Sequence, residues 1–179
     1  MAAVGAGGRG GGVSLEGRLR RLKAAGAPPR LSGPMQLAQA GVRGSRRYVE
    51  RHLDELKSLD ARVLNFETIA HPEVDILTSD LYGSVKNSPE MVKSLVAAAG
   101  RAGVPYRVRS ASAGVGTDAG RFSQAGLKAA SLLGFRVPGQ MVAFYHQRRD
   151  TSEVLSMEPL LNVLKLTLEW IASGGEASE

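Results

Sequence analysis

The sequence contains no cysteine among its 179 residues, so it can form neither a disulfide nor a thiolate metal site. A transition metal would have to be held by carboxylates and by the three histidines, His52, His71 and His146. No apolar run reaches the roughly 18 residues that a membrane-spanning helix needs. The arginines near the N-terminus are not followed by the apolar segment of a secretory signal. We therefore expect a cytoplasmic protein that does not span a membrane.

Acidic residues are scarce in residues 1–35, where six basic side chains face a single glutamate. This segment supplies most of the formal net charge of +6, and the rest of the chain is close to neutral. Its nine glycines and lack of an apolar period predict a disordered tail. A basic tail can bind phosphates without specificity. Because no aromatic interleaving and no nucleic-acid motif accompany it, nucleic-acid binding is the weakest of our function hypotheses.

From residue 36 to residue 174, predicted strands and helices alternate. Short apolar runs typical of strands lie at 61–67, 74–78, 105–110 and 127–133. The run at 74–78 fits another strand or an edge. Strands separated by helices imply crossover connections, so we predict an α/β fold, a three-layer α-β-α sandwich with a mostly parallel mixed sheet. The last residues, 175–179, are expected to be disordered.

Side chains that cap helices mark where the predicted helices begin. Ser45 is the predicted N-cap of the first helix, Ser88 with Pro89 begins another, and Ser156 caps the last. Gly126 is expected to end a short helix that follows residue 118. The apolar face of the last helix is marked by Met157, Leu160, Leu161, Leu164, Leu168 and Ile171. In an amphipathic helix such a stripe faces the core.

Three segments carry side chains suited to chemistry. Glu67 ends the strand ARVLNFE, at the kind of sheet edge where sites collect in open α/β folds. Asp118 ends the loop GVGTD, and taken alone it is better explained as the cap of the next helix than as a functional residue. His146 is followed four residues on by Asp150, a spacing that lets a carboxylate fix the tautomer of an imidazole. Taken singly, the glutamate fits a solvated strand end and the histidine an ordinary surface residue.

Taken together, these segments resemble the co-catalytic zinc aminopeptidase family, which also includes the glutaminyl cyclases and the glutamate carboxypeptidase II type of exopeptidase. The resemblance lies in LNFE, GTDA and YHxxxDT, in that order, before a long amphipathic helix. The segment AGVRGSRRYVERH, residues 40–52, is similar to the Gly-Leu-x-Gly-Ser helix start of the family. The resemblance extends from about residue 38 to residue 171.

The resemblance implies a pair of zinc ions that activate a water for peptide hydrolysis, with a glutamate as the base. It makes His146 a ligand to one zinc. Glu67 takes the position of the aspartate that binds the other. It also places Asp118 near the site as an outer or substrate-facing group, lets Asp150 support His146, and puts Tyr145 in the pocket lining.

The sequence also departs from the family. Two adjacent glutamates, one the base and one a ligand, normally precede the helix start, and here those positions are Ala38 and Gln39. The upstream histidine and the bridging aspartate of the family are not found. Of the remaining histidines, His52 is expected to pack against the core and His71 to be a plain loop residue. We therefore expect a domain truncated in its N-terminal half that is inactive as a single chain.

Two explanations for such a chain stay open. The Gly/Ala/Arg/Pro-rich residues 1–35 have the composition of GC-rich DNA read from a wrong start or out of frame. Alternatively, the chain is a non-catalytic remnant or an interaction subunit of a split peptidase. In that case a partner chain, or another copy in a homo-oligomer, would pair with an exposed edge of the sheet. A peptide substrate is expected only for the completed domain.

Overall fold

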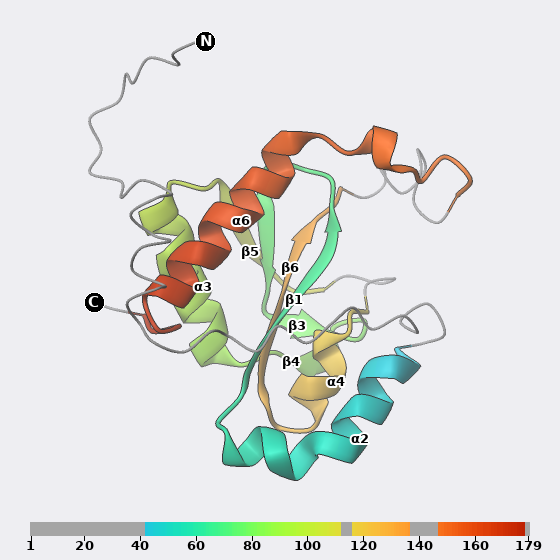
Figure 1. Ribbon diagram of the computed structural model, residues 1–179, viewed down its shortest axis with the longest axis vertical. Helices are drawn as coiled ribbons and strands as arrows, with labels where there is room; N and C mark the ends of the chain where they lie inside the picture. Colours follow the sequence, from blue (N-terminus) through green and yellow to red (C-terminus); the bar gives the residue numbers. More distant parts are fainter. Residues whose placement is uncertain (1–41, 112–115, 137–146, 178–179) are drawn as a thin grey trace.

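A computed structural model describes residues 42–111, 116–136 and 147–177, which form a sheet with helices on both faces (Figure 1). The four main strands are β1 (Arg62–Ile69), β2 (Val74–Leu77), β5 (Tyr106–Arg109) and β6 (Lys128–Gly134). Their order in the sheet is β1-β6-β2-β5. The β1–β6 and β2–β5 pairs are parallel and the β2–β6 pair is antiparallel. The predicted α/β fold with a mixed, mostly parallel sheet is confirmed.

The helices divide between the two faces of this sheet. The helices are α2 (Arg43–Ser58), α3 (Pro89–Ala102), α4 (Ala119–Gln124) and α6 (Met157–Ala172), with a short 3-10 helix η2 (Ser152–Val154) before the last. Helices α3 and α6 share one hydrophobic cluster with the sheet, and α2 and α4 share another with the opposite face. A small second sheet pairs β3 (Ser79–Asp80) with β4 (Val85–Lys86). None of the helices in the described ranges is long and apolar enough to span a membrane.

Strand β2 lies inside the sheet, between β6 and β5, which settles the choice left open by the sequence. All four of its residues are buried. Its Val74 and Ile76 face α3 and α6 and pack with Leu132 of β6 and Trp170 of α6. The indole N–H of Trp170 donates to the Ser94 hydroxyl at 2.9 Å, so this buried polar group is satisfied.

The capping predictions have mixed outcomes. Ser88 accepts a hydrogen bond from the Met91 N–H at 3.4 Å and begins α3, as predicted. The prediction for Ser45 is wrong. Helix α2 already begins at Arg43, and the Ser45 hydroxyl donates to the Val42 carbonyl at 3.1 Å from inside the first turn. A serine near a helix start can bond forward as a cap or backward to the preceding turn, and the sequence does not distinguish these.

The burial of α6 corrects another prediction. Four of the six residues of the expected stripe, Met157, Leu160, Leu161 and Leu164, are exposed, whereas Leu168 is half-buried and Ile171 packs against the core. The buried side consists of Pro159, Asn162, Val163, Leu166, Glu169 and Trp170. The two polar members of the buried side are satisfied, because Asn162 donates to the Pro72 carbonyl at 3.0 Å and Glu169 pairs with Arg101 at 2.9 Å. The helix is apolar on two opposite sides, and the sequence alone does not show which one packs inward.

Close packing at Gly120 gives a prediction for stability. A Cβ atom there would lie 2.7 Å from the Leu81 Cγ and 3.0 Å from the Asp80 Cγ. Because overpacking forces neighbours to shift, we expect Gly120→Ala to lower the free energy of unfolding by about 1–3 kcal/mol in urea denaturation. Gly100 is the matched control, since a Cβ atom added there would meet nothing within 4 Å. Gly100→Ala should stabilise helix α3 by roughly 0.5–1 kcal/mol. Equal effects of the two substitutions would contradict this packing.

Candidate functional site

Glu67, the predicted strand-end carboxylate, lies on the face of the sheet that α2 and α4 cover. Side chains alternate along a strand, so Val63, Asn65 and Glu67 point to one face of β1. Val63 packs against the cluster that contains residues of α2 and α4. Glu67 is half-buried and lies next to Leu133 in the register between β1 and β6. The carboxylate is therefore near the carboxyl end of β1, although the strand runs two residues beyond Glu67, to Ile69, and does not end there as predicted.

An irregularity in β1 follows directly after this carboxylate. The register with β6 shifts between Glu67 and Ile69, and Thr68 has a positive φ of 44°. The Thr68 hydroxyl donates to the Glu67 Oε1 at 2.9 Å. Bulges of this kind re-aim side chains at the ends of strands and are frequent beside functional sites. The Glu67 carboxylate therefore already has a partner within the chain.

A buried polar network connects the same face of the sheet to the start of α4. The Asn65 side chain donates to the Ser131 hydroxyl at 3.4 Å, and the Ser131 and Thr117 hydroxyls lie 2.6 Å apart. Thr117 donates from its hydroxyl to Asp80 Oδ2 at 2.5 Å and from its backbone N–H to Asp80 Oδ1 at 2.7 Å. Asp80, Thr117 and Ser131 are fully buried. The network fixes the position of the residue that follows Thr117.

That residue is Asp118, which stands at the N-cap position of α4 but makes no capping hydrogen bond with its side chain. Its backbone is already helical (φ −63°, ψ −31°), so its carboxylate is not placed to cap the first turn. The Thr117 hydroxyl accepts from the Ala119 N–H at 3.2 Å instead. The Asp118 Oδ1 is buried and has no hydrogen-bond partner among the described residues. Such oxygens are rare in folded proteins and call for an explanation in terms of strain, unseen water or function.

Glu67 and Asp118 are thus brought to the same side of the sheet, and the Asn65–Ser131–Thr117 hydrogen bonds connect their neighbouring residues. Other predicted site residues are not tested by this arrangement. Tyr145 and His146 lie outside the described residues, as do Ala38 and Gln39. Asp150 is in an exposed turn, where its N–H donates to the Gln147 carbonyl at 3.0 Å.

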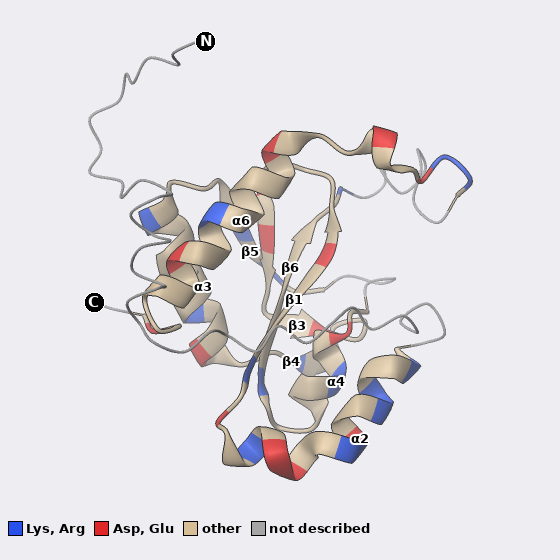
Figure 2. Ribbon diagram, in the orientation of Figure 1, with Lys and Arg blue, Asp and Glu red and all other residues tan. Residues whose placement is uncertain are grey.

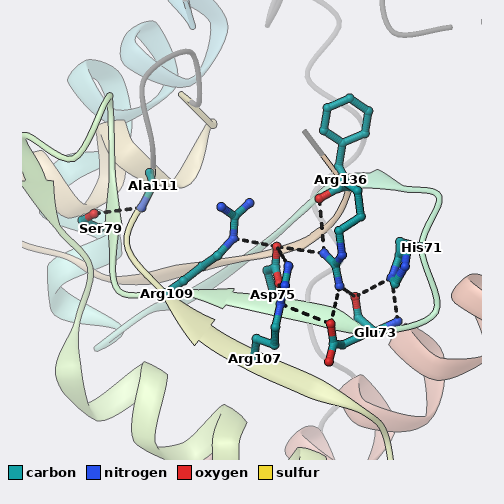
Figure 3. A network of polar contacts seen from close by, with 9 residues as sticks. His71, Glu73, Asp75, Ser79, Arg107, Arg109, Ala111 and Arg136 are labelled. Carbon is teal, nitrogen blue, oxygen red and sulfur yellow. Dashed lines mark hydrogen bonds and ion pairs between the residues drawn. The ribbon is translucent and has the colours of Figure 1, made fainter. Parts of the chain in front are cut away.

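The two described histidines have local partners. His71 follows β1, and its Nδ1 accepts a hydrogen bond from the Glu73 N–H at 3.1 Å (Figure 3). His52 lies on α2, where its ring stacks on Tyr48 with centroids 4.5 Å apart and its Nδ1 is 3.2 Å from a Glu55 oxygen. Each histidine therefore serves a contact within its own loop or helix.

The sequence reasoning missed a charged cluster on the same face of the sheet, around Asp75 in β2 (Figure 3). The Asp75 carboxylate is fully buried and accepts hydrogen bonds from three arginines: Arg107 at 3.0 Å, Arg109 at 2.6 Å and Arg136 at 3.1 Å. Glu73 lies 2.6 Å from Arg136 and 3.1 Å from Arg107. The hydrogen bond to Asp75 raises the pKa of Arg107 above its usual value. An aspartate inside the apolar run VDIL, beside a strand reading YRVR, was the available sequence signal.

The described residues do not by themselves fit a zinc site. Within the described ranges, no three histidine or carboxylate side chains come together in a group that could hold a metal ion. A catalytic zinc usually has three protein ligands. The carboxylates of Asp75 and Asp80 are already bonded to arginines or to buried donors, and the Nδ1 of His71 is bonded to a backbone N–H. Of the predicted site carboxylates, Glu67 and Asp118 are the two that the structure places on this face of the sheet.

Comparison with known proteins gives the family context of this geometry. The sequence model of peptidase family M28 matches residues 39–171. None of the curated proteins matches the chain in sequence. Among solved structures, the chain is similar to the LapA aminopeptidase of Legionella pneumophila, with a TM-score of 0.56 and 17% sequence identity. The alignment covers 77% of this chain and 37% of the LapA chain, so the two share a fold over little more than a third of that structure.

Proposed function

The chain belongs to peptidase family M28, and on that premise we propose that it is a peptidase-fold domain that does not hydrolyse peptides as a single chain. The observation that carries this proposal is the set of side chains in this chain that could bind a metal ion. The described residues offer Glu67 and Asp118 on one sheet face but no group able to hold a metal. With His146 added by resemblance, each of the family's two ions would still have fewer than three ligands from this chain.

The missing base supports the same proposal. Hydrolysis by the family needs a glutamate that accepts the proton of the attacking water and passes it to the leaving amine. Ala38 and Gln39 stand where the resemblance places the two glutamates, and neither side chain can accept a proton from the attacking water near neutral pH. When bound, zinc would supply a water of lowered pKa and polarise the scissile carbonyl. Within this chain, Glu67, Asp118 and His146 would then serve to bind and orient, and proton transfer would need a group from elsewhere.

An assay with a chromogenic aminoacyl substrate tests this proposal. We expect the purified chain with added zinc to release p-nitroaniline from leucine p-nitroanilide no faster than buffer does. After dialysis against zinc, metal analysis should find less than about one ion per chain, because two or fewer ligands per ion do not form a stable site. The controls are Glu67→Ala and His146→Ala, which should leave both readings unchanged. Turnover that a chelator abolishes and that Glu67→Ala removes would overturn the proposal.

A second candidate function is a subunit of a split peptidase, and the sheet topology favours it. Strand β1 has eight residues and pairs with β6, and no other described strand lies along its second edge. Open edges of this length are templates for pairing with another chain. Phe66 on this strand is 48% exposed, which adds an apolar contact for a partner. If a partner chain restores turnover on mixing, the first proposal stands for the single chain and this second function gains support.

A further inference from the structure

Helices α2 and α4 form the walls of a pocket of about 370 Å³, a volume in the range of small-molecule sites. The residues that line it come from α2, from α4 and from the residue after α4: Arg46, Val49, Glu50, Arg121, Gln124 and Ala125. Neither Glu67 nor Asp118 lines this pocket. It is therefore separate from the predicted peptidase site, and its polar side chains have no part in the function proposed above.

Arg121 brings a positive charge to this pocket without a counter-charge. The residue is half-buried, and its Nη1 donates to the neutral Gln124 Oε1 at 3.0 Å. Its Nε is buried and has no hydrogen-bond partner among the described residues. Within the described ranges, no carboxylate forms an ion pair with Arg121. A guanidinium that is partly removed from water normally has an acceptor or an anion beside it, so this side chain lacks a partner that its burial calls for.

The wall of the pocket that α2 provides is also basic. The Arg46 Nε donates to Glu50 Oε1 at 2.9 Å, and the Arg47 Nη1 donates to Glu50 Oε2 at 3.0 Å. One carboxylate therefore serves two arginines, and the two Nη groups of Arg46 have no hydrogen-bond partner in the part of the chain that the structure describes. Figure 2 shows the basic segments of α2 beside α4. Arg46 and Arg121 thus line the same pocket from two different helices.

The charge around the pocket indicates the kind of ligand that fits it. Arg46, Arg47 and Arg121 are accompanied by the single carboxylate of Glu50, which leaves an excess of two positive charges. A phosphate group carries a charge of about −1.5 to −2 near neutral pH and has three acceptor oxygens. Guanidinium groups bind such oxygens with pairs of N–H donors. A carboxylate ligand brings one negative charge and would compensate only half of the excess.

We propose that the pocket between α2 and α4 binds the phosphate group of a small ligand, held by Arg46 from one helix and Arg121 from the other. The side-chain amide of Gln124 adds a neutral donor, and Val49 and Ala125 offer apolar contacts to the rest of the ligand. The site needs neither zinc nor a partner chain, so its test does not depend on the peptidase proposal.

Titration of the full-length chain with inorganic phosphate, followed by NMR of the arginine Nε–H groups, tests the proposal. Burial of the Arg121 Nε slows the exchange of its proton with water, so its resonance reports on the pocket directly. We expect this resonance to shift saturably, with a dissociation constant on the order of 1 mM. Acetate should bind at least about tenfold more weakly, because it has one charge and two oxygens. Chloride at the same ionic strength should give no saturable shift.

Single substitutions distinguish the pocket from general attraction to a basic surface. Arg46→Gln, followed through the Arg121 resonance, should raise the dissociation constant for phosphate by about tenfold, and Arg121→Gln, followed through the Arg46 resonance, should do the same. The matched control is Arg51→Gln, which removes the same charge from an exposed position of α2 outside the pocket lining. It should change the constant by less than about twofold.

Two outcomes would overturn the proposal. One is an Arg121 resonance that does not approach saturation up to about 50 mM phosphate. The other is an equal loss of affinity in Arg51→Gln and Arg46→Gln, because the phosphate would then be attracted by the charge of α2 as a whole. Since Arg46 is exposed, its substitution leaves the packing of the chain intact and the comparison valid.

Discussion

Asp80→Ala is expected to lower the free energy of unfolding by about 4–5 kcal/mol, because it leaves buried donors without an acceptor. The carboxylate accepts from the Leu81 and Thr117 N–H groups, both at 2.7 Å, and from the Thr117 hydroxyl at 2.5 Å. Thr117 and Ser131 are themselves fully buried, so water cannot replace the lost acceptor. Urea denaturation of the variant and wild type measures the difference.

A local measurement separates this network from a general loss of packing. Because Thr117 precedes α4, Asp80→Ala should speed amide hydrogen exchange in α4 more than in α3. Thr117→Val is the matched variant: it removes one hydroxyl but keeps the two backbone hydrogen bonds to Asp80, so its cost should be less than half as large. If Thr117→Val and Asp80→Ala lower the free energy of unfolding equally, the hydrogen bonds from the backbone N–H groups to the Asp80 carboxylate do not contribute to stability.

Asp75→Ala is expected to lower the free energy of unfolding by about 3 kcal/mol, which is less than for Asp80→Ala, although three arginines bind this carboxylate. Removing one partner of a buried ion pair leaves the other charges uncompensated. The side chains of Arg107, Arg109 and Arg136 are 46%, 29% and 21% exposed, however, so they can turn towards water. This partial exposure is the reason for placing the cost at the lower end of the range for buried pairs. Denaturation in urea gives the free energy of unfolding.

Asp54 provides the control for this substitution, because it is an exposed aspartate on α2. Asp54→Ala should change the free energy of unfolding by no more than about 0.5 kcal/mol. Asp75→Asn keeps the size of the side chain and part of its acceptor capacity. Its loss in the free energy of unfolding should therefore lie between those of Asp54→Ala and Asp75→Ala. A cost below about 1 kcal/mol for Asp75→Ala would mean that the arginines find equivalent partners when the carboxylate is gone.

Local signals in the sequence predicted much of the fold. The Ser88–Pro89 pair marked the start of α3, and the apolar run before Glu67 marked β1 with the carboxylate near its carboxyl end. These features depend on residues within a few positions of each other. The position of Glu67 on the sheet was predictable for the same reason, since alternation along one strand fixes the face once the buried side is known.

Features that depend on distant residues were not predictable. The partners of Asp75 lie 32 to 61 residues away, and nothing local shows that three arginines meet one aspartate. On α6, two apolar stripes compete for the core, and packing against α3 decides in favour of the side with Leu166 and Trp170. At Asp118 the sequence suggested a cap, but the neighbouring Thr117 hydroxyl takes that role because Asp80 and Ser131 hold it in place.

The position of β6 in the sheet has a consequence for the synthesis of the chain. β6 is the last of the described strands in the sequence, yet it lies between β1 and β2 and hydrogen-bonds to both. Arg62 pairs in register with Lys128, so the strand that pairs with β1 among the described residues follows only after more than sixty further residues have been made. Pairings of such high contact order form slowly. During translation, β1 therefore leaves the ribosome well before its partner and is exposed to chaperones and to other nascent chains until β6 emerges.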